Sequence, residues 1–292
     1  MPIFTGSGTA VVTPFGADGK FNYGAYEKLI EFQIANGADA IITCGTTGEA
    51  STLSLMEHVE VVGAAAAITN GRVPVIAGAG GNDTNDCIEL GKACTDVGAN
   101  ALMYVTPYYN KPSQRGIIAH YTALDKAVNA PIVMYNIPGR CVTNMTSKTI
   151  AEIAQLPNVV AIKEASGDFG QVAEIAELCD ITIYSGNDDY ILPILSLGGK
   201  GVISTTGNIA PKTMHDMVTK YLAGDTAEAL KLQLSILGLM RQLFADGNPV
   251  GVKAALNLMG FGMGDCRLPL ATAEESHVNA LAAEMKKFGL LA

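Results

Sequence analysis

Positive charge is scarce in this sequence. Lysine and arginine number 19 against 28 aspartates and glutamates, which leaves a formal net charge of -9 and an isoelectric point near 4.9. An acidic protein repels polyanions and anionic lipid surfaces. Nucleic acids and membranes are therefore not expected as partners.

Long apolar runs and targeting signals are also missing. Mean hydropathy is +0.26, yet no uncharged apolar run approaches the roughly 18 residues that a membrane span needs. No lysine or arginine precedes Lys20, whereas secretory and mitochondrial leaders begin with positive charge. We therefore expect a cytoplasmic protein.

The sequence has no metal-binding or triad motif. The six cysteines include no CxxC pair, and the four histidines lie far apart and away from the predicted strand ends. Zinc sites and Ser-His-Asp triads need such residues in clusters. We expect reduced cysteines, most of them in the core, and no metal site.

Short β-branched runs recur along the chain, each bounded by Gly, Pro or Asn. They begin at Gly8, Ala38, Pro74, Ala99, Pro131, Val159, Thr182 and Gly201. Nearly continuous apolar runs are typical of strands buried on both faces of a parallel sheet, and segments with helical spacing separate them. The runs start about 28 residues apart, the length of one βαβ step. Eight such units predict a (β/α)8 barrel.

The alternative is a doubly wound open sheet, which normally carries a Gly-rich dinucleotide motif after its first strand. Thr13-Pro14-Phe15 stands at that place. We therefore predict an α/β fold, a (β/α)8 TIM barrel over residues 1–210. Residues 211–292 are expected to form the last barrel helix and a C-terminal helical extension, in one structural unit.

Lys163 interrupts the otherwise apolar strand Val159–Ile162. Burial lowers the pKa of a lysine, and the free amine can attack a ketone to form a Schiff base. The competing interpretation is a structural ion pair, but Glu164 should point to the opposite face of the strand. Lys253, with apolar neighbours in a helix, is interpreted as a lysine whose stem is covered while its ammonium reaches solvent.

Other candidates lie where the barrel strands end. Gly45–Glu49 offers hydroxyls and backbone N–H groups to a small carboxylate, or is simply a Gly-rich turn with threonine capping. Tyr108, Tyr109 and Tyr135 could shuttle protons or belong to the core. Arg140 could bind a carboxylate in a bidentate manner or be an ordinary surface arginine.

Five motifs together are highly specific. GTTGE at Gly45, TPYYNKP at Thr106, YNIPGR at Tyr135, IKEASGD at Ile162 and GVIS at Gly201 resemble the dihydrodipicolinate synthase family, in order and spacing, over the whole chain. This family belongs to the pyruvate-dependent class I aldolases, which also include N-acetylneuraminate lyase.

The resemblance implies a lyase that condenses pyruvate, held as a Schiff base on Lys163, with L-aspartate 4-semialdehyde in the diaminopimelate route of lysine biosynthesis. Tyr135 is then the general acid/base, and Thr46 and Tyr109 complete the proton relay. Tyr109 is expected to come from a neighbouring subunit, so a homo-oligomer is implied, either a dimer or a dimer of dimers (homotetramer). No metal or organic cofactor is implied, because the lysine imine itself accepts the electrons.

The resemblance also assigns substrate contacts. Thr47 matches the residue that binds the pyruvate carboxylate, Ile203 a backbone contact to the same substrate, and Gly186 a further substrate-binding position. Arg140 matches the arginine that holds the semialdehyde carboxylate, which distinguishes the synthases from the sialic acid lyase branch.

The chain differs from the lysine-inhibited members of this family at their feedback-inhibition site. The inhibitor site is matched at Ser51, His58, Asn82 and Tyr108, and it differs at Ala50, Leu55 and Asp86, where serine, histidine and glutamate are typical. Each lost polar partner weakens binding by about 1 kcal/mol or more. We expect weak or absent inhibition by L-lysine.

Two alternatives to the synthase remain at this stage. One is a sister aldolase that cleaves a 2-keto-3-deoxy sugar acid. The other is an inert barrel that serves as a sensor or scaffold, since fold does not dictate function. An inert barrel has no reason to keep Lys163, Tyr135, Tyr109 and Thr46 together.

Overall fold

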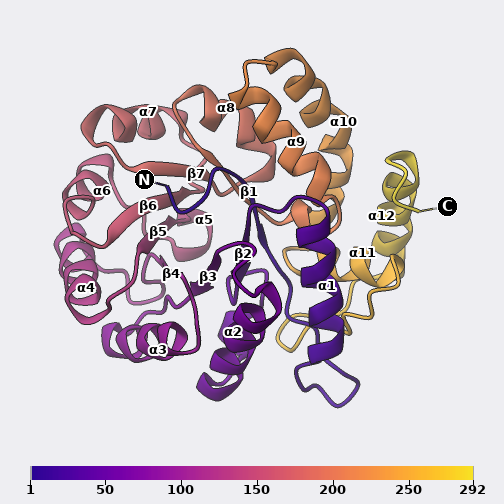
Figure 1. Ribbon diagram of the computed structural model, residues 1–292, viewed down its shortest axis with the longest axis horizontal. Helices are drawn as coiled ribbons and strands as arrows, with labels where there is room; N and C mark the ends of the chain where they lie inside the picture. The colour runs from indigo at the N-terminus through magenta and orange to yellow at the C-terminus, as the bar shows by residue number, and fades with distance from the viewer. Residues whose placement is uncertain (1, 292) are drawn as a thin grey trace.

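Eight parallel strands close into a barrel in the computed structural model, which describes residues 2–291 (Figure 1). The strands are β1 (Gly6–Ala10), β2 (Ala40–Thr43), β3 (Val75–Gly78), β4 (Ala101–Val105), β5 (Ile132–Asn136), β6 (Val159–Glu164), β7 (Thr182–Ser185) and β8 (Gly201–Ser204). Each strand pairs with the next in sequence, and β8 returns to β1, where Gly8 lies opposite Ile203. The predicted α/β class and (β/α)8 barrel are confirmed.

Helices surround the barrel and continue beyond it. The barrel helices are α1 (Tyr23–Ala35), α2 (Leu55–Thr69), α3 (Thr84–Asp96), α4 (Gln114–Ala127), α6 (Ser147–Ile153), α7 (Phe169–Leu178), α8 (Ile191–Ser196) and α9 (Pro211–Leu222). The C-terminal extension consists of α10 (Thr226–Phe244), α11 (Val250–Leu258) and α12 (Glu275–Lys287). Short elements at the strand ends are α5 (Pro138–Cys141) and the 3₁₀ turns η1 (Ala50–Thr52), η2 (Asp188–Tyr190) and η3 (Thr206–Asn208).

The strands are apolar throughout because both of their faces are buried. In β2, Ile41 packs outward against the helices, while Ala40 and Ile42 belong to a separate cluster inside the barrel. Within this inner cluster the ring of Phe4 stacks on Tyr184, with centroids 4.3 Å apart. The barrel interior is therefore a packed core, which leaves the carboxyl ends of the strands for chemistry.

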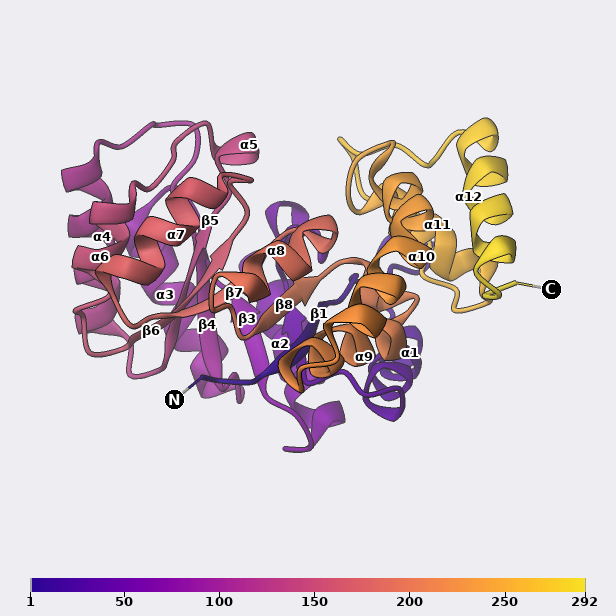
Figure 2. The same cartoon turned by 90° about the horizontal axis from the view of Figure 1, so that it is seen from above.

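The extension packs against one side of the barrel. Helix α10 contacts α9, and α11 and α12 contact each other and α10; Figure 2 shows α11 and α12 set off from the barrel on the same side. The segment that leads into α11 and the one that follows it both reach the carboxyl ends of the strands, as described below. Among residues 2–291, no helix combines the length and the apolar character needed to cross a membrane.

Candidate active site

Lys163 points into the barrel from β6, between β5 and β7, where it lies opposite Tyr135 on one side and Tyr184 on the other. The residue is 6% exposed. Burial lowers the pKa of its ammonium to about 8; the charge of Asp188 opposes this shift, and that of Arg140 adds to it. A lysine with this pKa has about a tenth of its amine in the free form at pH 7, and imine formation requires this free form.

Glu164 is not the partner of Lys163. Its side chain lies on the other face of β6, where it accepts hydrogen bonds from the backbone N–H of Ser166 at 2.6 Å and from Nδ2 of Asn136 at 3.1 Å. Within residues 2–291, Lys163 takes part in no ion pair shorter than 4.0 Å, whereas nine other such pairs occur. The alternation of side chains along a strand explains this separation.

Tyr135 covers the amine of Lys163. The Nζ atom lies 4.3 Å from the centroid of the Tyr135 ring. Burial raises the pKa of this phenol to about 12, although Arg140 and a hydrogen bond with the Thr46 side chain oppose the rise. The phenol is therefore neutral near pH 7 and can hold a proton beside a reacting centre.

Thr47 belongs to the Gly45–Glu49 turn that follows β2. Its hydroxyl accepts a hydrogen bond from Nδ2 of Asn248 at 2.9 Å and lies 3.3 Å from the hydroxyl of Thr205. The turn is fixed from the segment after β1, because the Thr13 hydroxyl donates to the Gly48 carbonyl at 2.7 Å. This arrangement places the Thr46 side chain in a hydrogen bond with Tyr135 and the Thr47 hydroxyl against Asn248 and Thr205.

Arg140 and Thr47 share a neighbour that the sequence analysis missed. Arg140 lies on α5, is exposed, and donates to the backbone carbonyl of Asn248 at 3.2 Å. Asn248 therefore contacts both predicted carboxylate-binding residues. It lies just before α11, outside the strand ends to which candidates were confined, and only its place in a Gly-Asn-Pro turn could have drawn attention to it.

Gly186 and Ile203 lie close to the lysine strand. A Cβ at Gly186 would stand 2.7 Å from the Ala165 Cβ and 3.2 Å from the Lys163 Cγ, so only glycine fits there without displacement. Ile203, on β8, is buried in the cluster inside the barrel. Gly186 therefore lies against the Lys163 side chain, and Ile203 lies in the barrel interior into which Lys163 points.

Tyr109 does not join this group. It lies in the loop after β4 with its side chain 88% exposed and its backbone in the left-handed region, at φ 72°. In contrast, Tyr108 turns toward the cavity described next. The structure therefore brings together Lys163, Tyr135, Thr46 and Thr47 but leaves Tyr109 outside the site of its own chain.

A cavity of about 630 Å³ opens beside these residues. Its walls include Thr46, Tyr135, Arg140 and Asn248. The positions at which the sequence departs from lysine-inhibited relatives, Ala50, Leu55 and Asp86, line the same cavity together with Ser51, His58 and Tyr108. Neutral hydroxyls, one guanidinium and a buried amine suit a small keto acid and a second carboxylate.

Lys253 corrects one prediction. Its Nζ lies 2.6 Å from Oε1 of Glu49, and both side chains are buried, at 2% and 1% exposed. It also donates to the Asp265 carbonyl at 3.1 Å and sits 4.2 Å from the centroid of the Phe15 ring. The prediction that its ammonium reaches solvent was wrong, because α11 packs between the barrel and α12. The lysine there meets a carboxylate from a turn that is distant in sequence.

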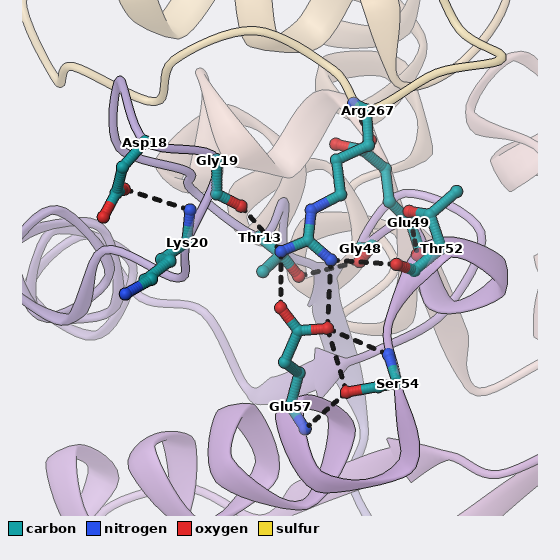
Figure 3. A network of polar contacts seen from close by, with 10 residues as sticks. All are labelled: Thr13, Asp18, Gly19, Lys20, Gly48, Glu49, Thr52, Ser54, Glu57 and Arg267. Atoms are coloured by element: carbon teal, nitrogen blue, oxygen red, sulfur yellow. Dashed lines mark hydrogen bonds and ion pairs between the residues drawn. The ribbon is translucent and has the colours of Figure 1, made fainter.

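Arg267, in the segment after α11, links the Gly45–Glu49 turn to the C-terminal part of the chain (Figure 3). Its backbone N–H donates to Oε2 of Glu49 at 2.8 Å, and its guanidinium holds both carboxylate oxygens of Glu57 at 2.5 and 3.1 Å. It also donates to the carbonyls of Thr52 and Gly19. The Gly45–Glu49 turn is thereby held from α2 and from the chain beyond α11.

Comparisons with known proteins show the family of this chain. A family model described as the Dihydrodipicolinate synthetase family matches residues 3–288. A 4-hydroxy-tetrahydrodipicolinate synthase from Lachnoclostridium phytofermentans is 50% identical over 294 residues, covering 100% of both chains.

Solved structures of the same kind superpose closely. Dihydrodipicolinate synthase from Thermotoga maritima is 42% identical, with a TM-score of 0.97 over 99% of this chain and 100% of the other. The chloride-inhibited enzyme from Acinetobacter baumannii, complexed with pyruvate, is 40% identical, with a TM-score of 0.96 over 98% of this chain and 99% of the other. With this similarity over nearly its full length and a buried lysine at the centre of its barrel, the chain belongs to the dihydrodipicolinate synthetase family.

Proposed function

We propose that this chain is a lyase of the class I aldolase type that condenses pyruvate with L-aspartate 4-semialdehyde to give 4-hydroxy-tetrahydrodipicolinate, in the diaminopimelate route to lysine. The observation that carries the proposal is the amine of Lys163, buried in the barrel beneath the Tyr135 ring. The relative that is 50% identical over the full length is named for this reaction.

The proposed reaction begins at Lys163. The free amine attacks C2 of pyruvate, and the keto oxygen leaves as water, which gives a protonated imine. Loss of a proton from the methyl group yields an enamine, and its C3 attacks the aldehyde carbon of the semialdehyde. The amino group of that substrate then closes on C2 and displaces Lys163, which regenerates the free enzyme.

Tyr135, Thr46 and Tyr109 are proposed to carry the protons. The pKa of Tyr135, raised by burial, keeps this phenol neutral, and the Thr46 side chain is its hydrogen-bond partner. A hydroxyl between two phenols can relay a proton without bringing net charge into the buried site. The exposure of Tyr109 supports its contribution to a second subunit's site, because an 88% exposed phenol is free to enter a neighbour.

Thr47, Ile203, Gly186 and Arg140 are proposed as the substrate-binding residues. Thr47 would bind the pyruvate carboxylate with its hydroxyl, which Asn248 already orients. Ile203 would contribute a backbone group, and Gly186 would leave room beside Lys163. Arg140, exposed at the edge of the cavity and tied to the Asn248 carbonyl, would hold the carboxylate of the semialdehyde.

The proposal extends to assembly and location. A homo-oligomer, as a dimer or a dimer of dimers, would complete each site with a partner's tyrosine, and a cytoplasmic location suits the free cysteines. We also propose that the barrel core at 1–210 and the helical part at 211–292 act as one structural unit. The pair between Glu49 and Lys253, which joins the two parts, supports this.

Borohydride trapping tests the proposed function. Incubation with pyruvate followed by reduction should add one pyruvate-derived group, and peptide mapping should place it on Lys163. Lys163→Met should take up nothing, whereas Lys148→Met, which removes an exposed lysine, should be labelled like the wild type. An unlabelled, folded wild-type protein would favour the inert barrel, and labelling with turnover of a sugar acid instead of the semialdehyde would favour the sister aldolase.

A further inference from the structure

Asn248 is a buried amide that joins the start of α11 to the turn after β2. It is 8% exposed, and its Nδ2 lies 2.9 Å from the hydroxyl oxygen of Thr47. Its Oδ1 is buried and has no hydrogen-bond partner among the described residues. A buried polar atom without a partner is unfavourable, so its presence in a native structure needs a reason. The contact with Thr47 is the reason that the structure offers.

The amide fixes the direction in which the Thr47 hydroxyl donates. An amide nitrogen carries two hydrogens and accepts none, so Asn248 can only donate to the Thr47 oxygen. The hydroxyl therefore accepts on this side, and its own hydrogen points to another acceptor. Within residues 2–291, the other hydrogen-bond partner of this hydroxyl is the hydroxyl of Thr205, 3.3 Å away.

The contact between Thr47 and Thr205 is long for two hydroxyls. Hydrogen bonds between hydroxyls usually measure about 2.7 to 2.8 Å, and this one measures 3.3 Å. A carboxylate is a stronger acceptor, because hydrogen bonds to an ionised group are shorter and roughly twice as strong as neutral ones. The hydrogen of Thr47 is therefore free to pass from Thr205 to a bound carboxylate.

A second contact holds the turn in place independently of the amide. Lys253 of α11 pairs with Glu49 at 2.6 Å, and both side chains are buried. Glu49 is two residues beyond Thr47 in the same turn. Loss of the Asn248 amide alone should therefore leave the turn where it is and release only the direction of the Thr47 hydroxyl.

The backbone of Asn248 has a separate contact. Its carbonyl accepts a hydrogen bond from Nη2 of Arg140 at 3.2 Å, and both residues line the cavity of the candidate active site. A substitution of the Asn248 side chain leaves this carbonyl in place. The contacts of the side chain and of the backbone can therefore be tested separately.

We propose that Asn248 is a positioning residue for the two carboxylates of the reaction. Its side chain makes the Thr47 hydroxyl a donor to the carboxylate of pyruvate, and its backbone carbonyl holds Arg140 for the carboxylate of the second substrate. This inference rests on the proposed function, and its side-chain part rests only on the pyruvate half.

Borohydride trapping at increasing pyruvate concentration tests the role of the side chain. Asn248→Ala removes the donor to Thr47, so the half-saturating concentration of pyruvate should rise about fivefold. Acetone, in which a methyl group replaces the carboxylate, should be trapped on Lys163 at a rate within about twofold of the wild type. Asn279→Ala, the matched control at an exposed asparagine of α12, should match the wild type with both ketones.

Asn248→Asp tests the direction of the hydrogen bond. An ionised aspartate is close to asparagine in size but can only accept, so it draws the Thr47 hydrogen toward itself and adds a negative charge beside the keto acid. The half-saturating concentration of pyruvate should rise at least about threefold further than in Asn248→Ala. This variant also decides the matter if Asn248→Ala does not fold.

A double-mutant cycle tests whether Asn248 acts through Thr47. Thr47→Val removes the hydroxyl and should by itself raise the half-saturating concentration of pyruvate at least about fivefold. Adding Asn248→Ala to Thr47→Val should then change that concentration by less than about twofold. If the effects of the two substitutions multiply instead, the role through Thr47 is refuted.

Steady-state assays test the role of the backbone. Asn248→Ala keeps the carbonyl that holds Arg140, so the KM for the semialdehyde should stay within about twofold of the wild type while the KM for pyruvate rises. An equal rise in both values would overturn the division between side chain and backbone.

The outcomes separate this inference from the proposed function. If wild-type protein forms the pyruvate adduct but Asn248→Asp has the half-saturating concentration of the wild type, the inference alone is overturned. An equal loss of trapping with acetone and pyruvate in Asn248→Ala overturns it as well, since that loss marks a general structural defect. Failure of folded wild-type protein to form any pyruvate adduct refutes the proposed function, and the inference with it.

Discussion

The ammonium of Lys253 lies 2.6 Å from the carboxylate of Glu49, in a pair that is almost completely buried. Glu49 closes the turn that carries Thr46 and Thr47, and its backbone is left-handed, at φ 55°. The lysine comes from α11, in the C-terminal extension. The extension is therefore connected by charge to the turn that binds substrate in our proposal.

Removal of one partner of this pair should strongly destabilise the protein. Lys253→Met leaves the Glu49 carboxylate buried without its cation, so we expect the free energy of unfolding to fall by about 3 to 5 kcal/mol. Urea denaturation monitored by circular dichroism measures this change. Lys212→Met, which breaks an exposed pair with Asp216, should cost less than about 1 kcal/mol, and equal losses in the two variants would contradict the structure.

The pH dependence of imine formation should follow Lys163. Its pKa is lowered to about 8 by burial, and only the free base attacks the ketone. The rate of trapping with pyruvate should therefore rise with pH through this value and fall about tenfold for each unit below it. Stopped-flow or quenched borohydride trapping gives the profile, and a midpoint near the ordinary value of 10.5 would show that the amine is solvated.

Loss of the Lys163 amine should stabilise the fold. Lys163→Met replaces a desolvated ammonium with an apolar side chain of similar length, so the free energy of unfolding at pH 7 should rise by on the order of 2 kcal/mol. Activity should disappear in the same variant. Thermal and urea unfolding provide the measurement, and a large loss of stability would mean that Lys163 supports the structure instead of the reaction.

Gly186 should not tolerate a methyl group. Gly186→Ala places a Cβ 2.7 Å from Ala165 and 3.2 Å from the Lys163 side chain, which should cost about 1 to 3 kcal/mol of stability. The displaced lysine should also lower kcat at least about tenfold. Gly139→Ala, where no atom lies within 4 Å of the added methyl, serves as the control and should change stability by less than about 0.5 kcal/mol.

Inhibition by L-lysine should be weak or absent. Leu55 and Ala50 offer no polar side-chain group to a charged ligand, and both line the cavity with Asp86. Steady-state assays should show less than half inhibition at micromolar L-lysine. The variant with Ala50→Ser, Leu55→His and Asp86→Glu should lower the half-inhibitory concentration at least about tenfold, and potent inhibition of the unaltered protein would refute this expectation.

The sequence alone was sufficient for the barrel and for its central lysine. Strands buried on both faces need continuous apolar runs, and eight such runs at regular spacing admit few folds. Lys163 was recognisable because it is the charged residue in an otherwise apolar run. A strand buried on both faces leaves such a side chain without hydration. Glu164 could be assigned to the other face from the two-residue period of a strand.

Contacts between distant segments were decided only by the tertiary structure. No local pattern indicates that Lys253 meets Glu49, that Asn248 lies between Thr47 and Arg140, or that Asp188 holds the turn at Thr205. Each contact joins two segments whose separation in sequence says nothing about their distance in space. The sequence determines which groups can ionise or donate, whereas the packing of the chain determines which of them are desolvated together, and desolvation sets their pKa values and their roles.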